Sequence, residues 1–243
     1  MNQAPASVAV VTGANGGIGA AVARTLAARG YQLVLAGFNG QTVGHQLASE
    51  LGSAVYLDAD LSQPAGAQDV ADLCAVTYGR LDLLVNNAGI GIPVPHADLQ
   101  AVTADFFTRM LEVNLLGPWH LTRASEAMLK TSGGLVINVS SVAGSTVSGS
   151  SIPYAVSKAG LEHMTRCLAV AMGPEVRVNA IAPGYIETER TREWVAVRDQ
   201  VVQHAPAARL GTPSDVATAI LTLIDATYTT GAVLPVDGGL GLV

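Results

Sequence analysis

The fold is decided by the stretch V-A-V-V-T-G-A-N-G-G-I-G, which runs from residue 8 to residue 19. Its valine-rich start predicts a short buried strand, and the turn from Gly13 to Gly19 leads into an amphipathic helix that is closed by Gly30. Glycines lack a Cβ atom, so a diphosphate can approach the backbone and the positive end of the helix. A glycine turn between the first strand and the first helix therefore predicts a dinucleotide site, and a tight strand-to-helix connection is the simpler alternative.

Strands and helices alternate along the rest of the chain. Six further strands are predicted at 31–36, 54–57, 81–85, 135–139, 176–181 and 232–236. Helices are predicted at 63–78, 103–130, 155–172 and 214–224, the last with Ser214 as its N-cap. This alternation predicts an α/β fold, a doubly wound parallel sheet of about seven strands with helices on both faces. The length of 243 residues fits one domain that spans residues 1–243.

Composition argues against several classes of function. Charged residues make up 13% of the chain, the net charge is −6, and no basic cluster exists, so we expect neither nucleic acid nor a membrane as partner. Cys74 and Cys167 have no metal-like spacing and are expected to be buried thiols in a reducing compartment. Residues 1–7 lack the features of a signal peptide, and no apolar run could span a bilayer. These features predict a soluble, cytoplasmic protein.

A second informative stretch runs from Ser141 to Lys158 and ends in Y-A-V-S-K. Tyr154 and Lys158 are four residues apart on a predicted helix, so the phenol and the ammonium can point into one site. Pro153 suits the first turn of that helix, where a missing N–H costs nothing. Ser141 follows the predicted strand 135–139, which allows its hydroxyl to face the phenol across a loop.

These residue types suit proton transfer. Free tyrosine titrates near pH 10, which is too high for a general base at neutral pH, and a fixed cation such as Lys158 favours the phenolate. Tyr154 is therefore expected to exchange a proton with an alcohol or ketone oxygen that Ser141 holds. The alternative is an interfacial tyrosine and a solvated lysine. No metal is expected, since ligand spacing is absent among the five histidines His45, His96, His120, His163 and His204.

Taken together, the motifs resemble those of the short-chain dehydrogenases/reductases over nearly the whole length. The resemblance rests on T-G-x-x-x-G-x-G at 12–19, N-N-A-G at 86–89, Asn114, Ser141, Y-x-x-x-K at 154–158 and N-x-x-x-P-G at 179–184. Ser140 competes with Ser141 for the serine role, and the family's usual separation from the tyrosine favours Ser141. The resemblance implies a Rossmann-type fold and hydride transfer between a nicotinamide and a carbonyl or secondary alcohol.

The resemblance also implies roles for individual residues. Asn114, Ser141, Tyr154 and Lys158 would be catalytic, with Asn114 holding a water that is linked to Lys158. The cofactor NAD(P)(H) would be bound by Gly13, Asn15, Gly17, Ile18, Gly19, Phe38, Asn39, Asp60, Leu61, Asn87, Ala88, Gly89, Tyr154, Lys158, Pro183, Gly184, Ile186 and Thr188.

The choice between NAD and NADP depends on the end of the second strand. An acidic residue there would bind the ribose diol and repel a 2′-phosphate, but this chain has Gly37 at that place. Gly16 and Phe38 occupy the positions where the family usually has a basic residue for the phosphate. The sequence therefore leaves the cofactor open, with a slight preference for NADP and with Asn39 and backbone N–H groups as phosphate donors.

The substrate is the least defined feature. Residues 185–208, which include Trp194, lie where the family has a substrate lid, and 228–242 is similar to bacterial 3-oxoacyl-carrier-protein reductases. An acidic carrier would need a basic patch, and the segment 130–134 offers only Lys130. The substrate is thus a small carbonyl or alcohol, either a 3-oxoacyl thioester or the substrate of a polyol, sugar or other secondary-alcohol dehydrogenase. A non-catalytic dinucleotide sensor is the remote alternative.

The resemblance implies an assembly as well. The predicted helices at 103–130 and 155–172 pair across two-fold axes in this family, so we expect a homotetramer or homodimer.

Overall fold

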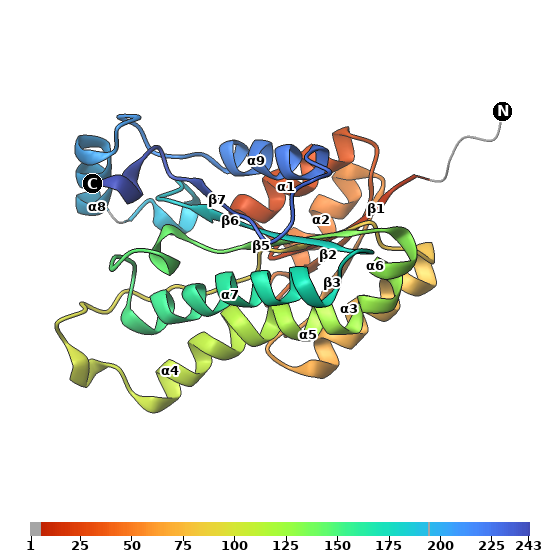
Figure 1. Ribbon diagram of the computed structural model, residues 1–243, viewed down its shortest axis with the longest axis horizontal. Helices are drawn as coiled ribbons and strands as arrows, with labels where there is room; N and C mark the ends of the chain where they lie inside the picture. The colour runs from red at the N-terminus through yellow and green to blue at the C-terminus, as the bar shows by residue number, and fades with distance from the viewer. Residues whose placement is uncertain (1–5, 194) are drawn as a thin grey trace.

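The computed structural model describes residues 6–193 and 195–243, and Trp194 of the expected lid lies outside that range. Its centre is one parallel sheet of seven strands in the order β3-β2-β1-β4-β5-β6-β7 (Figure 1). The predicted doubly wound α/β fold with helices on both faces is confirmed. The strands are β1 Val8–Thr12, β2 Gln32–Gly37, β3 Ala54–Asp58, β4 Leu83–Asn86, β5 Leu135–Val139, β6 Arg177–Pro183 and β7 Val233–Val236.

Helices cover the two faces of the sheet and enclose two hydrophobic cores (Figure 1). One face carries α1 Gly17–Ala28, α2 Gln41–Leu51 and α9 Pro213–Asp225. The other carries α3 Pro64–Tyr78, α4 Ala104–Leu111, α5 Gly117–Ala124, α6 Glu126–Ser132 and α7 Ile152–Ala171, and α8 Val195–His204 lies near the C-terminus.

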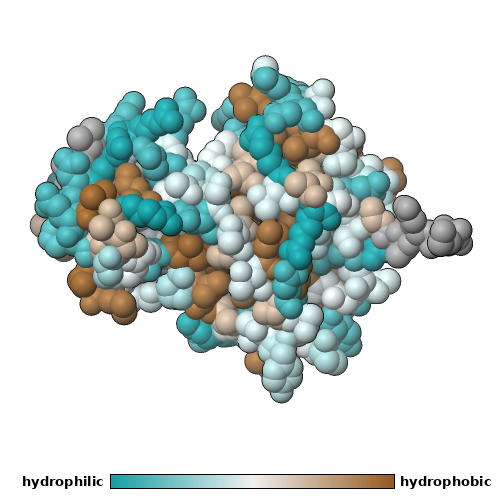
Figure 2. All heavy atoms as spheres, turned by 90° about the horizontal axis from the view of Figure 1, so that it is seen from above, coloured by the Kyte–Doolittle hydropathy of each residue, from teal (hydrophilic) through white to brown (hydrophobic). Residues whose placement is uncertain are grey.

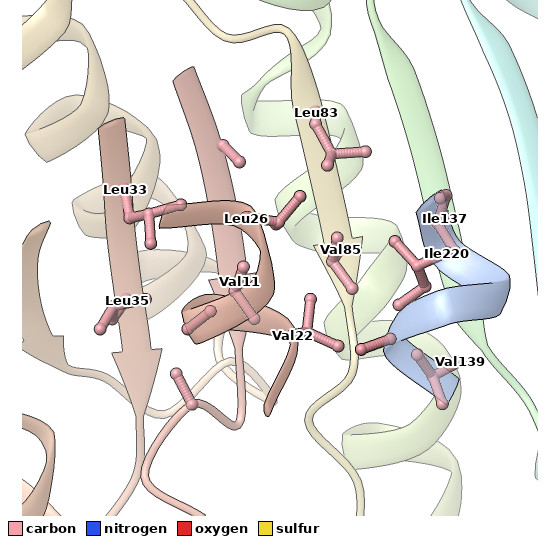
Figure 3. Close-up of a cluster of buried hydrophobic side chains, with 14 of the residues drawn as sticks. Val11, Val22, Leu26, Leu33, Leu35, Leu83, Val85, Ile137, Val139 and Ile220 are labelled. Atoms are coloured by element: carbon pink, nitrogen blue, oxygen red, sulfur yellow. The ribbon is translucent and has the colours of Figure 1, made fainter. Parts of the chain in front are cut away.

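Alternate residues of a strand point into different cores. In β1, Val11 packs with Val22 and Leu26 of α1 in the core of Figure 3, whereas Val10 packs into the core beneath α3. All five residues of β1 are buried, as expected for the central strand of a sheet that is covered on both faces.

The sequence analysis did not predict helix α2. Its N-cap is Gly40, its C-cap is Gly52, and it contains Gly44, so its helix propensity is low. The reason for Gly44 is packing: a Cβ atom built there would lie 2.0 Å from Cε2 of Tyr56. The Tyr56 ring therefore packs directly against the backbone of the helix.

Other boundaries differ from the predictions in detail. The predicted helix 103–130 is divided into α4, a π-helical turn over Glu112–Leu116, α5 and α6. Helix α7 begins at Ile152 rather than at residue 155, because the side chain of Ser151 caps it. The N-cap of α9 is Thr212, not Ser214, and Thr212 forms a capping box with Asp215.

The two cysteines are both free thiols, but only Cys74 is buried. The prediction that Cys167 is buried was wrong, because that side of α7 faces outward. Within residues 6–193 and 195–243, none of the helices combines the length and the apolarity that a bilayer crossing requires.

Candidate active site

A cleft of about 1370 Å³ opens at the carboxyl edge of the sheet. The chain order of the strands reverses between β1 and β4, and a parallel sheet binds ligands at this kind of switch point. In Figure 2, apolar side chains gather toward the end of the molecule that carries α8, and the surface is indented beside them. Fourteen of the predicted site residues line the cleft: Gly13, Asn15, Gly17, Ile18, Asn87, Ala88, Gly89, Ser141, Tyr154, Lys158, Pro183, Gly184, Ile186 and Thr188.

The glycine turn has the geometry of a diphosphate cradle. Gly13 and Gly17 have φ angles of +63° and +52°, which L side chains rarely adopt. Gly19 does not line the cleft. It lies beneath the turn, where a Cβ atom would be 2.2 Å from the carbonyl oxygen of Gly13. The residues present therefore fit a dinucleotide whose diphosphate lies at the amino end of α1.

The loop after β4 is fixed against the glycine turn. Thr12 Oγ1 accepts hydrogen bonds from the backbone N–H groups of Asn87 and Ala88, both at 2.9 Å. The Asn87 amide in turn donates to the carbonyl oxygen of Thr12 at 2.8 Å. These bonds hold 87–89 on the floor of the cleft beside the glycine turn.

Tyr154 and Lys158 come from the first turns of α7, as predicted. The Ser151 hydroxyl accepts a hydrogen bond from the Tyr154 N–H at 3.4 Å and so caps the helix. Lys158 is buried, donates from Nζ to the carbonyl oxygen of Val139 at 2.8 Å, and lies 5.8 Å from the centre of the Tyr154 ring. The ammonium and the positive end of α7 both favour a negative charge on the phenol oxygen.

The two adjacent serines after β5 differ in their partners. Ser141 Oγ accepts from the N–H of Ala143 at 3.2 Å, caps a short 3₁₀ turn and lies on the cleft. Ser140 Oγ is buried and donates toward Glu162 on α7. Ser141 is therefore the serine whose hydroxyl can still donate to a substrate oxygen.

Asn114 is fully buried beneath the cleft, in the π-helical turn. Its side-chain amide forms a reciprocal pair with the backbone of Ile90, at 2.8 Å to the N–H and 2.9 Å to the carbonyl oxygen. Its Nδ2 also donates to Ser157 at 3.1 Å. A Cβ atom built at Gly89 would lie 3.1 Å from Asn114 Oδ1 and 3.5 Å from Lys158 Nζ, so both groups face one small space. A π-turn at such a place is typical of functional sites.

The remaining predicted cofactor residues lie outside the cleft lining, around the ends of β2 and β3. Phe38 and Asn39 are exposed in the loop after β2, and Asn15 Nδ2 of the glycine turn reaches the Phe38 carbonyl oxygen at 3.4 Å. Asp60 accepts from the hydroxyl of Ser62 at 2.6 Å, and Leu61 packs against the core beneath α3.

Sequence analysis missed Asp58 in this region. Its carboxylate accepts hydrogen bonds from the backbone N–H groups of Asn39 (3.2 Å) and Gly40 (3.0 Å). The sequence analysis expects Asn39 and backbone N–H groups to bind a phosphate, but these two N–H groups donate to Asp58 instead. The D-A-D pattern at 58–60 was the available signal, because one carboxylate ends the strand and a second follows two residues later.

The expected lid and the end of the chain form another part of the cleft wall. Ile186 forms a β-bridge with Gly211, and Thr188 lies close to Gly17. Val197, Val201, Leu240 and Val243 add apolar surface. His96 also lines the cleft, and its buried Nε2 has no hydrogen-bond partner among the described residues. In the same part of the chain, no group of three His, Cys, Asp or Glu side chains is placed to hold a metal.

Comparisons with known proteins agree with this geometry. A family model described as enoyl-(acyl carrier protein) reductase matches residues 13–241. A protein of Streptomyces violaceoruber that is named as ketoacyl reductase 2 of the granaticin polyketide synthase is 48% identical over 242 residues, which cover 98% of this chain and 97% of that protein. The 3-oxoacyl-[acyl-carrier-protein] reductase MabA of Mycobacterium tuberculosis is 34% identical over 238 residues, 96% of this chain and 92% of MabA.

A solved structure from Burkholderia xenovorans, described as a short-chain dehydrogenase/reductase, superposes with a TM-score of 0.91 at 33% identity and covers 99% of this chain and 100% of that one. Fold and cleft thus define a dinucleotide-dependent oxidoreductase. Within that class, the chain belongs to the short-chain dehydrogenase/reductase family. It is an NAD(P)-dependent enzyme that interconverts carbonyl and alcohol groups, and the resemblance to 3-oxoacyl-carrier-protein reductases is confirmed.

Proposed function

We propose that this enzyme reduces the keto group of a 3-oxoacyl thioester or a related polyketide-type ketone. The observation that carries the proposal is the placement of Ser141, Tyr154 and Lys158 on one cleft beside a glycine turn. The relative named as a granaticin ketoacyl reductase, 48% identical over nearly the full length, supports this substrate class. The apolar side chains Val197, Val201 and Leu240 in the cleft lining suit an acyl chain or a fused ring system.

In the proposed reaction the residues of the chain position and protonate the substrate. Bound NAD(P)H supplies the hydride. Ser141 donates a hydrogen bond to the carbonyl oxygen, and Tyr154 gives that oxygen its proton. Lys158, held by its bond to Val139, stabilises the phenolate that remains.

Asn114 acts indirectly in this proposal. It fixes the backbone of Ile90 and faces, together with Lys158, the space above Gly89. A water in that space would return a proton from solvent to the site.

A second candidate substrate is a free secondary alcohol or ketone. Two carboxylates, Glu189 and Glu193, line the cleft. An acidic carrier protein would be repelled there, and this observation favours a small substrate that is not tethered to a carrier. The apolar lining favours a cyclic or long-chain alcohol over a polyol or sugar.

The proposal includes an assembly and a location. Large apolar side chains are exposed on the π-turn, α5 and α7, namely Leu116, Trp119, Val156 and Val170. Burying them between two copies would form a homodimer or homotetramer with α5 and α7 at the interface. Light scattering at micromolar concentration would test this, and a monomeric mass would contradict it. A cytoplasmic location fits the free thiols of Cys74 and Cys167.

The function is tested by a substrate panel that includes 3-oxoacyl thioesters, bicyclic ketones, secondary alcohols and sugars, each with both nicotinamide cofactors. Absorbance of the reduced nicotinamide reports turnover. We expect the thioesters or bicyclic ketones to be reduced and Tyr154→Phe to lower kcat by about 10²- to 10⁴-fold while the dinucleotide still binds. Binding without turnover of any member of the panel would favour the sensor, and wild-type turnover by Tyr154→Phe would refute the assigned chemistry.

A further inference from the structure

The end of β2 is where a dinucleotide fold of this kind contacts the ribose next to the adenine. In this chain that position is Gly37, and the space beside it is filled by neighbouring side chains. A Cβ atom built at Gly37 would lie 2.5 Å from the hydroxyl oxygen of Tyr56 and 3.1 Å from Cγ of Asn15. An acidic side chain on β2 therefore has no room here.

A carboxylate reaches the same place from the next strand. Asp58 is the last residue of β3 and is paired in register with Gly37. Its oxygens accept hydrogen bonds from Asn39 N–H, from Gly40 N–H and, at 3.4 Å, from the Tyr56 hydroxyl. Asn39 adopts a φ of +53°, which turns its N–H and the next one toward the carboxylate. Three donors thus fix the position of this carboxylate.

Tyr56 is suited to remain one of these donors. The pKa of Tyr56 is raised to about 12, mainly because the phenol is buried and, to a smaller extent, because the Asp58 carboxylate is nearby. The phenol is therefore protonated at neutral pH and keeps its hydrogen for Asp58.

The negative charge of Asp58 is not neutralised by a basic side chain. Across residues 6–193 and 195–243, none of the ion pairs includes it. A carboxylate offers about four lone pairs, and three are used, so one remains for a ribose hydroxyl. A 2′-phosphate would instead meet a like charge and would find the N–H groups of Asn39 and Gly40 already bound.

From this arrangement we propose that the enzyme prefers NAD(H) over NADP(H) and that Asp58 is the residue that discriminates between them. Asp58 takes the place of the acidic residue that β2 lacks. The inference rests on the proposed function only in that both need a dinucleotide in this crevice. It reverses the slight preference for NADP, which rested on the absence of an acidic residue at Gly37 and on Asn39 and backbone N–H groups as phosphate donors.

Calorimetric titration with NAD⁺ and NADP⁺, without substrate, tests the proposal. We expect the wild-type protein to bind NAD⁺ at least about tenfold more tightly. Asp58→Asn removes the charge at nearly constant shape and should reduce that ratio by about tenfold, mainly by strengthening NADP⁺ binding. Asp72→Asn is the matched control, because Asp72 is an exposed carboxylate on α3 that is bonded to Gln68, and it should leave the ratio unchanged.

The possible results separate a failure of the role of Asp58 from a failure of the proposed function. Equal or tighter binding of NADP⁺ by the wild-type protein would overturn the role of Asp58 and leave the proposed function standing. An unchanged ratio in a folded Asp58→Asn protein would do the same. Binding of neither dinucleotide would overturn the proposed function together with this inference. The wild-type ratio needs no variant, so the proposal can fail even if Asp58→Asn does not fold.

Discussion

The hydroxyl of Ser140 donates a hydrogen bond to Oε1 of Glu162 at 3.1 Å, and this contact distinguishes Ser140 from its neighbour Ser141. Glu162 is buried on α7, and burial raises the pKa of its carboxyl. Ser140 thus ties the end of β5 to the helix that carries Tyr154 and Lys158. Both serines line the cleft, but the hydroxyl of Ser141 makes no bond to Glu162 and, among the described residues, only accepts from the N–H of Ala143.

Substituting each serine by alanine should therefore separate activity from stability. Ser141→Ala removes a donor to the substrate oxygen and should lower kcat by about 10²- to 10³-fold with little change in the unfolding free energy. Ser140→Ala leaves a buried carboxyl without its donor and should lower the unfolding free energy by about 1–3 kcal/mol, with kcat within about tenfold of wild type. Steady-state kinetics and urea denaturation measure the two effects. The opposite pattern would assign the substrate contact to Ser140.

The glycine turn offers a matched pair of substitutions. A Cβ atom at Gly19 would lie 2.2 Å from the backbone oxygen of Gly13, whereas a Cβ atom at Gly16 would have no heavy atom within 4 Å. Gly16 has an extended φ of 171°, which other residues also adopt. Gly19→Ala should therefore displace the turn and weaken dinucleotide binding by at least about tenfold, with a lower melting temperature. Gly16→Ala should preserve both properties.

Dinucleotide titration and thermal unfolding of the two variants provide the measurement. If Gly19→Ala bound as tightly as Gly16→Ala, close packing at Gly19 would not be what shapes the cradle.

The order of elements could be predicted because its signals are local. All seven strands were found within a few residues of their true ends, since each is a short apolar run between turn residues. Helix α2 was missed because Gly44 lowers its propensity, and the reason for Gly44 is the Tyr56 ring, which belongs to another strand. Contacts between two different elements, such as this one, do not change the local sequence pattern from which a helix is predicted.

In the candidate site, too, the residues with local sequence motifs were predicted and those that depend on contacts between elements were not. Motif positions predicted fourteen of the residues that line the cleft. Asp58 was missed because its role depends on the register of β3 against Gly37 and on the positive φ of Asn39, neither of which is readable from one strand. The π-turn at Asn114 was likewise hidden within a continuous helical pattern.

The effect of Gly44→Ala on the unfolding free energy should depend on the size of the side chain at residue 56, and it should change from destabilising to neutral or stabilising when that side chain is made smaller. Alanine is favoured over glycine in a helix by about 1 kcal/mol, but here its Cβ would lie 2.0 Å from the Tyr56 ring. In the wild-type background we expect a loss of about 1–3 kcal/mol of unfolding free energy from overpacking. In a Tyr56→Leu background the same substitution should be neutral or stabilising. A double-mutant cycle by urea denaturation gives the coupling, and stabilisation in the wild-type background would contradict the contact.

Asp215 makes part of the stability depend on pH. The Arg209 guanidinium first, and then the Thr212 N–H, hold the pKa of Asp215 well below its ordinary value of 3.8. Because the pKa in the folded state is lower than in the unfolded state, the ionised carboxylate stabilises the fold fully above about pH 4. That contribution is lost as the pH falls through the folded-state pKa.

Asp215→Asn should therefore cost about 1 kcal/mol at pH 7, a value limited by the exposure of Arg209 and set mainly by the helix cap. The cost should shrink below about pH 4, because the carboxyl of the unfolded wild-type chain is then protonated while the folded protein still holds it ionised. Urea denaturation between pH 3 and pH 7 measures the difference. Asp225→Asn controls for the loss of a surface carboxylate, since Asp225 pairs with Arg29 in an exposed ion pair and caps no helix N-terminus. A cost for Asp215→Asn that stays constant or grows toward pH 3 would show that hydrogen bonding in the capping box, and not the ionised carboxylate, stabilises the start of α9.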